Sequence, residues 1–372
     1  MRLGTQAALA AVFALGLCAA AEAQDLIRTK SGEVKCKITA MNSKGITYSE
    51  TGGKVTTVKA EDVVNVTLGD PPASLAKAEA AIANSQYDKA ISNYNAALEE
   101  ITKEKKRDLH KWYILFQIAN AQNQKGSPNE ALETYRRLRN EGNDTWYRSQ
   151  SFQRSMEIAR VKGGDAYEGI LKEMKSEPEP VGSQAELELA KIKYTGGDFD
   201  SARAGFEKVA SNPASPFAAD AKLFALRCIR SAKKMDELES ACKAILNDKG
   251  NSPALLQAAG AWTADLQLKK AEKDKTKWRD ILMICVNAIA LGPPAGKDES
   301  EDYALALITG GKLYVLMSNA NDKAEAKEEY KSRAVAYYTE VKRAYGKTAS
   351  AEIAQKELVA LGVDQPKAPE KK

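Results

Sequence analysis

Few residues of this 372-residue chain have the type and spacing that catalysis or metal binding requires. The single histidine, His110, stands in Lys-Arg-Asp-Leu-His-Lys-Trp at the charged entrance to a predicted helix, with no nucleophile signature nearby. We therefore expect it on the surface. One histidine excludes most zinc sites and every histidine-based triad that is not centred on it. The sequence predicts no enzyme, no cofactor and no metal site.

Two glycine pairs and the cysteines do not change this expectation. Gly163-Gly164 and Gly196-Gly197 are each followed by Asp, which would repel phosphate, so both are predicted to be turns and helix caps. Cysteine spacing in the body of the chain matches no metal-binding pattern; the residues are Cys36, Cys228, Cys242 and Cys285. Cys228 and Cys242 fall on two antiparallel helices of one predicted hairpin, where they could form a disulfide or be two small buried apolar side chains.

The first 23 residues are predicted to be a signal peptide. Met-Arg is followed by an apolar run from Ala7 to Ala21, and Ala21-Glu22-Ala23 places cleavage after Ala23. The run is shorter than the roughly 20 residues of a membrane-spanning helix, and no later stretch is apolar enough to span. Leu15-Gly16-Leu17-Cys18 resembles a lipoprotein box, but Leu17 stands where that family has a small residue, so lipid anchoring is not expected. We expect a periplasmic or extracellular protein.

The charge balance argues against a strongly basic binding surface on this protein. The chain has 55 Lys and Arg against 50 Asp and Glu, a formal charge of +5, with both signs scattered along it. Proteins that bind nucleic acid usually concentrate a larger basic excess on one face. We expect no nucleic-acid partner.

Residues 25–69 are predicted to form a small β module. Val34, Cys36 and Ile38 alternate with polar residues at the period of a half-buried strand, and Gly52-Gly53 is a hairpin signal. About five short strands fit into the segment. Its turn and core pattern resembles the small Sm-like barrels, which implies a barrel-like fold and a capacity for RNA or peptides; the signal peptide argues against RNA. The module is expected either to cap the helical array or to bind a partner.

From Ser74 to Gly362 the pattern is helical and repetitive. One helix face recurs four times as a small residue followed by an aromatic and a second apolar residue; the four sets are Ala90, Tyr94 and Ala97; Ala131, Tyr135 and Leu138; Ala202, Phe206 and Val209; and Ala334, Tyr338 and Val341. Small residues stand twelve positions before the first three sets, at Ala78, Ala119 and Ala190. Small residues on both helices allow a close approach that the aromatic fills.

The glycine pairs that begin at residues 163 and 196 lie 33 residues apart. This spacing and the recurring helix faces make residues 74–362 resemble the tetratricopeptide family. The fold class expected is therefore mainly α, a tetratricopeptide-type α-solenoid of six or seven helical hairpins behind a small all-β barrel-like module. Residues 363–372, with two prolines and mostly charged neighbours, are predicted to be a disordered tail.

The resemblance places the first helix of each hairpin on the inner face of the array. Counting from the repeat, the inward residues are Tyr113, Phe116, Asn120, Asn123, Lys191, Tyr194, Arg227 and Arg230. Aromatic, amide and cationic groups together suit an extended peptide or its acidic end. Carboxylate-binding members of the family have Lys where this chain has Phe116, so capture of a terminal carboxylate is not expected. The other interpretation of these positions is a solvated face with its aromatics packed against neighbours.

Two functions follow from this organisation. The first is a non-catalytic scaffold or adaptor of the bacterial cell envelope that binds protein or peptide partners, a second copy of itself among them. The alternative is an accessory protein that binds cell-wall glycan through tryptophans expected to be exposed, which are Trp112, Trp146, Trp262 and Trp278.

Overall fold

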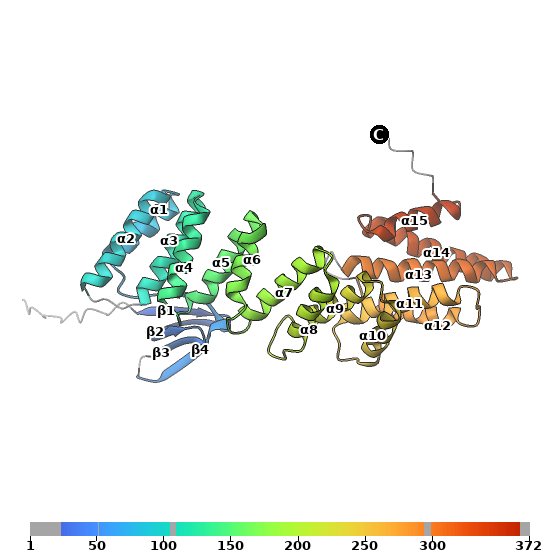
Figure 1. The fold of residues 1–372 in the computed structure, drawn as a ribbon, viewed down its shortest axis with the longest axis horizontal. Coiled ribbons are helices and arrows are strands. Elements are labelled where there is room, and N and C mark those ends of the chain that lie inside the picture. Colours follow the sequence, from blue (N-terminus) through green and yellow to red (C-terminus); the bar gives the residue numbers. More distant parts are fainter. Residues whose placement is uncertain (1–23, 51, 105–108, 294–298, 365–372) are drawn as a thin grey trace, which may run out of the picture. The chain divides into compact units, whose positions relative to one another are not determined.

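The computed structural model describes residues 24–50, 52–104, 109–293 and 299–364. The predicted signal peptide and most of the predicted tail lie outside these ranges. The chain divides between Ile170 and Leu171, within one helix, into two compact units, called unit 1 (up to Ile170) and unit 2 (from Leu171). Figure 1 follows the chain from the sheet through the helices of both units.

Unit 1 begins with a five-stranded antiparallel sheet. Its strands are β1 (Asp25–Thr29), β2 (Gly32–Asn42), β3 (Gly45–Ser49), β4 (Val55–Lys59) and β5 (Val63–Thr67). Their order is β4-β3-β2-β1-β5, and the long strand β2 pairs with β1 along its first half and with β3 along its second. The five short strands are thus confirmed, and a 3₁₀ turn, η1 (Ala60–Asp62), separates the last two.

The closed barrel expected for this module is wrong. Closure would require β4 to pair with β5, but among the described strands these two form the outer edges of an open sheet. The physical reason lies on the sheet's apolar face, where Ile27, Ile38 and Ile46 are at most 2% exposed because they pack against helices of the same unit. Helices, rather than further strands, cover the apolar side chains that a barrel would enclose.

The carboxylate of Asp25 anchors the start of β1 through hydrogen bonds. Asp25 is 1% exposed, and its carboxylate accepts hydrogen bonds from two backbone N–H groups, that of Ile38 at 2.6 Å and that of Gly69 at 2.7 Å. The two donors come from β2 and from the segment after β5. A buried carboxylate satisfied by backbone donors on both sides therefore ties both neighbours of β1 to it.

The remainder of the described chain is helical, which confirms the mainly α prediction. The helices are α1 (Ala73–Ala83), α2 (Tyr87–Glu104), α3 (Leu109–Lys125), α4 (Pro128–Glu141), α5 (Tyr147–Lys162), α6 (Gly164–Met174), α7 (Val181–Thr195), α8 (Phe199–Ala210), α9 (Ala218–Ser231), α10 (Met235–Asn247), α11 (Pro253–Ala271), α12 (Trp278–Ala290), α13 (Glu299–Asn319), α14 (Ala324–Ala344) and α15 (Ala349–Ala360). Successive helices pair from α1 to α5 and from α7 to α14, and α15 packs on α13 and α14. None of the described helices combines the length and the apolar character that a membrane span needs.

The repeating face predicted from the sequence is the buried face of its helices. All twelve residues of the four sets are at most 2% exposed, and so are Ala78, Ala119 and Ala190. Close approach is visible at Gly205, where an added Cβ would lie 2.9 Å from the Cβ of Ala190 on the preceding helix. The same holds for Gly311, where it would lie 2.5 Å from the ring of Tyr338. Small residues thus set the spacing of the hairpins, as the pattern indicates.

Contacts between hairpins recur at a fixed separation in sequence. Five side-chain hydrogen bonds join residues 33 or 34 positions apart: Glu79 with Tyr113, Asn129 with Lys162, Glu179 with Asn212, Asp200 with Lys234, and Arg203 with Glu237. Equivalent positions of successive hairpins therefore touch in both units. This is the stacking expected of a repeat of about 34 residues.

In unit 1 the helices and the sheet share one core. Leu115 and Phe116 of α3, Tyr135 of α4 and Tyr147 of α5 are buried in the same cluster as the apolar face of the sheet, which Figure 1 shows beside these helices. Ser43 adds a polar tie, since its backbone N–H donates to the carboxylate of Asp144 at 3.0 Å. The β module is therefore part of the unit-1 core.

Two expectations about single side chains are wrong. His110 is 1% exposed instead of lying on the surface, because α3 begins at Leu109 and residues 110, 114 and 118 share its buried face. Trp262 and Trp278 are 2% and 6% exposed, and their indole N–H groups donate to Asp302 and to the carbonyl of Glu272. These tryptophans are core residues and offer no stacking surface to a sugar.

The cysteines among the described residues are buried and form no disulfide, Cys228 and Cys242 included. They lie in two different hydrophobic clusters of unit 2. Burial raises the pKa of each thiol to about 11 and that of Cys285 to about 12. Each side chain therefore serves as a small apolar group.

Candidate functional site

Unit 2 contains a groove of about 1490 Å³, called here the cationic groove. Its lining comes from α7, from α9 and the turn that follows it, from the start of α13, and from the end of α14 with the turn into α15. Four of the sequence-predicted residues line it: Lys191, Tyr194, Arg227 and Arg230. The inner positions of two successive hairpins thus meet in one concave surface.

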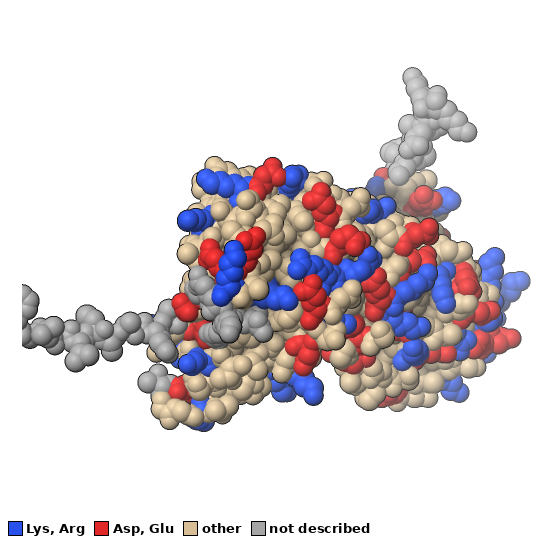
Figure 2. Space-filling view, turned by 60° about the vertical axis from the view of Figure 1, so that its left-hand side comes forward, with Lys and Arg blue, Asp and Glu red and all other residues tan. Residues whose placement is uncertain are grey.

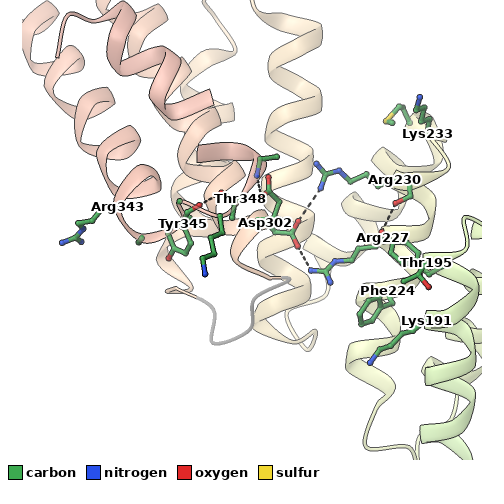
Figure 3. Close-up of a pocket in the computed structure, with 18 residues that line it drawn as sticks. Lys191, Thr195, Phe224, Arg227, Arg230, Lys233, Asp302, Arg343, Tyr345 and Thr348 are labelled. Carbon is green, nitrogen blue, oxygen red and sulfur yellow. Dashed lines mark hydrogen bonds and ion pairs between the residues drawn. The ribbon is translucent and has the colours of Figure 1, made fainter. Parts of the chain in front are cut away.

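The floor of the cationic groove is organised around Asp302, which is 3% exposed. Its carboxylate lies 3.0 Å from a guanidinium nitrogen of Arg227 and 3.6 Å from one of Arg230 (Figure 3). It also accepts the indole N–H of Trp262 at 2.9 Å. Helices α9, α11 and α13 supply these four side chains. A buried carboxylate with three such neighbours fixes the positions of both arginines.

Phe224 forms an aromatic wall beside this floor. Its ring stacks on Phe206 at 5.1 Å between centroids and meets Tyr194 at 6.3 Å. The ammonium of Lys191 lies 5.2 Å from the Phe224 ring centroid, and the guanidinium of Arg227 lies 5.3 Å from it. Cations held over an aromatic face at these distances keep a defined orientation. The Lys191 side chain is 35% exposed and accessible to a ligand, whereas that of Arg227 is only 11% exposed.

The opposite wall is the turn between α14 and α15. Glu301 of α13 holds it, since its carboxylate accepts the backbone N–H of Ala349 at 3.0 Å and the hydroxyl of Ser350 at 2.9 Å. A carboxylate at the first turn of a helix is favoured by the helix dipole. The ring of Tyr345 packs at a tilt against that of Tyr303, with 5.4 Å between centroids, and burial raises the pKa of Tyr345, so its phenol stays protonated at neutral pH.

The lining carries an excess of positive charge. Six basic side chains face two acidic ones: Lys191, Arg227, Arg230, Lys233, Arg343 and Lys347 against Glu301 and Asp302. On the face seen in Figure 2, basic and acidic side chains are intermingled. The lining of the cationic groove differs from that face in its excess of positive charge.

The four sequence-predicted residues of unit 1 are not brought into such a groove. Phe116 is 8% exposed and packs on the rings of Tyr135 and Tyr147 in the core shared with the sheet. Tyr113 is partly buried and donates to Glu79 at 2.8 Å, and Asn120 accepts the hydroxyl of Tyr135 at 2.5 Å. Asn123 alone is exposed.

Sequence reasoning misses the far side of the cationic groove. Asp302, Tyr345 and Lys347 stand outside the repeat signature, and their part in the groove depends on how α13 to α15 return towards α9. The weak signal in the sequence is the aspartate just inside a long apolar helix, since a carboxylate buried in such a helix needs cationic or donor partners.

Comparisons with known proteins assign no family. No family model matches the chain, and no curated protein matches it. Among solved structures, a tetratricopeptide repeat protein from Parabacteroides merdae is 15% identical, covers 78% of this chain and 98% of its own, and has a TM-score of 0.34. The C-terminal part of a repeat protein from Cytophaga hutchinsonii is 17% identical, with coverages of 75% and 98% and a TM-score of 0.40. A likeness at these TM-scores assigns neither family nor function, so both rest on this chain's own residues.

Proposed function

We propose that this chain is a non-catalytic scaffold of the bacterial cell envelope, built from tetratricopeptide-type hairpins, which binds protein partners in the cationic groove. The contacts at 33 or 34 residues support the repeat type, since 34 residues is the tetratricopeptide period. The buried helix faces support the repeat type independently, because the same spacing of small and aromatic residues is buried on helices of both units.

The observation that carries the proposal is the convergence of Lys191, Tyr194, Arg227 and Arg230 on one surface. Those residues follow from the repeat alone, as its inward positions, and a groove formed from inward positions of stacked hairpins is the binding surface of a solenoid. Aromatic walls and oriented guanidinium groups are the kinds of side chain that dominate protein interfaces. A partner segment lying there would contact both Phe224 and the arginines.

Location in the envelope is supported by the sequence of residues 1–23. The expected measurement is the intact mass of the protein purified from the native cell envelope, which should correspond to a chain beginning at Gln24. A mass that retains Met1, together with recovery from the cytosolic fraction, would contradict this part of the proposal. A glycan-binding role has no comparable support, because two of the four tryptophans it needs are buried.

Photo-crosslinking in living cells tests the binding role. A photoreactive phenylalanine derivative replaces Thr195, which is exposed and lines the cationic groove. The matched control places it at Lys243, which is exposed on α10 of the same unit and outside the groove lining. We expect a discrete protein adduct at position 195 that is absent at position 243. Equal adducts at both positions, or none at 195, would contradict the proposal.

A further inference from the structure

We propose that the cationic groove recognises an extended acidic segment of its protein partner, through carboxylates of that segment's side chains. This inference rests on the proposed function and specifies its ligand. The groove exceeds the 300 to 1,000 Å³ typical of small-molecule pockets, so its volume of about 1490 Å³ suits a length of polymer.

Both acidic groups of the lining are already engaged. Asp302 is occupied by Arg227, Arg230 and Trp262, and Glu301 caps α15. Lys233 and Lys347 are exposed, and the described residues provide neither with an ion-pair partner. Lys191 has one, Glu188, at 3.1 Å. The positive charge on both walls is therefore left for a ligand to neutralise.

Arg230 is the group best placed to bind a carboxylate. Its guanidinium lies 4.8 Å from the Trp262 ring centroid and 3.6 Å from Asp302, which orients it without a hydrogen bond to that carboxylate. Its side chain is 38% exposed. An oriented guanidinium whose donors are not used by Asp302 can form the paired hydrogen bonds that carboxylates accept. Preorganisation of this kind reduces the entropy that binding loses.

The arrangement favours a peptide over other polyanions. Phe224 and Tyr345 give each wall an aromatic surface, onto which the apolar parts of a peptide can pack. In Figure 3, Arg343 lies at the outer edge and points away from Asp302, whereas Arg227 and Arg230 point towards it. Because Asp302 partly neutralises these two arginines, the groove suits carboxylates spread along a peptide better than the dense charge of a nucleic acid.

Fluorescence anisotropy with the full chain tests this recognition. The probe is a labelled peptide of alternating Glu and Ala, and the comparison peptide has Gln at every Glu. The variants are Lys233→Glu, Lys347→Glu and Arg230→Gln, with Lys243→Glu as a control that makes the same charge change outside the groove. Reversal of one exposed charge near a bound carboxylate should weaken binding about fivefold, and loss of the oriented guanidinium about tenfold or more.

We expect the Glu peptide to bind, the Gln peptide to fail, binding to weaken as salt rises, and Lys243→Glu to behave as wild type. Equal binding of both peptides would overturn the inference, as would an equal loss with Lys243→Glu. Tighter binding of single-stranded RNA or polyphosphate, with the same variants reducing it, would overturn it in favour of a phosphate ligand. Should Arg230→Gln unfold the chain, the two exposed lysines decide the result.

The crosslinking at Thr195 separates failure of this inference from failure of the proposed function. An adduct at Thr195 whose mapped contact peptide carries no cluster of Asp or Glu would overturn the acidic specificity and leave the scaffold role intact. The absence of any adduct would remove the role itself.

Discussion

Replacement of Asp302 by alanine should lower the stability of unit 2 more than the loss of an exposed ion pair would. Asp302 is 3% exposed and joins α9, α11 and α13 through Arg227, Arg230 and Trp262. The side chain of Arg227 is itself only 11% exposed, so the substitution removes the nearest counter-charge of a mostly buried cation. Loss of one partner from a buried ion pair costs about 3 kcal/mol or more.

Hydrogen exchange measured by mass spectrometry on the full chain is the suitable assay, because it reports the opening of individual helices. A loss of about 3 kcal/mol should accelerate exchange in peptides of α11 and α13 roughly a hundredfold, where exchange proceeds by opening. Asp200→Ala is the matched control. Asp200 also pairs with a lysine, Lys234, but its side chain is 78% exposed, so its removal should change exchange by less than about threefold.

The double variant Asp302→Ala with Arg227→Met completes the test. Removal of both charges should recover part of the loss, because an apolar pair avoids the buried, uncompensated cation. Exchange in α11 and α13 that is unchanged by Asp302→Ala would refute the reasoning. So would a double variant as unstable as the sum of the two single ones.

Three further perturbations follow from the packing. Gly311→Ala should lower stability by about 1 to 3 kcal/mol in thermal unfolding, because the new Cβ would lie 2.5 Å from the Tyr338 ring, whereas Gly169→Ala, with nothing within 4 Å, should be neutral or stabilising. Asp25→Asn should lower the stability of the sheet by about 2 kcal/mol and accelerate its hydrogen exchange, because an amide offers one acceptor oxygen to the two backbone N–H donors. Unchanged exchange in β1 and β2 would contradict the role of Asp25 in holding the sheet. Burial raises the pKa of Cys285 to about 12, so the folded state favours the protonated thiol. The contribution of this thiol to stability should therefore fall as pH rises from about 9 towards 12. Rapid labelling of the thiol in native protein at about pH 8 would contradict its burial as a protonated group.

The repeating part of this fold can be predicted from the sequence because its signals are local. A small residue and an aromatic four positions apart mark a buried helix face wherever they recur, and Ala131 with Tyr135 or Ala202 with Phe206 behaves as that spacing requires. Alternation in residues 34–38 likewise identifies a strand, because its period of two differs from that of a helix.

What the sequence does not reveal depends on contacts between distant segments. Closure of the sheet fails because helices of the same unit cover its apolar face, and no strand pattern reports that competition. His110 is buried because of the point at which α3 begins, and a shift of one or two residues in a helix start moves a side chain to another face. Element boundaries are the least certain part of such a prediction.

The candidate site divides in the same way. The wall made by Lys191, Tyr194, Arg227 and Arg230 follows from the repeat register, which places equivalent positions on one surface. The wall made by Tyr345 and its neighbours depends on the return of α13 to α15. That path is set by packing between three helices of which only α14 carries the repeat face. Phe116 holds an equivalent inward position, yet it is buried in the core that the helices of its unit share with the sheet.

The most direct test of the account is the hydrogen-exchange footprint of the captured partner on the full chain. We predict protection in α7, in α9, at the start of α13, and in residues 343–348, which form the end of α14 and the turn after it, with exchange elsewhere in unit 2 unchanged. The Lys347→Glu variant should reduce that protection, and Lys243→Glu should not. Protection confined to other helices, or a footprint that Lys347→Glu leaves intact, would contradict the claim that the cationic groove is the binding site.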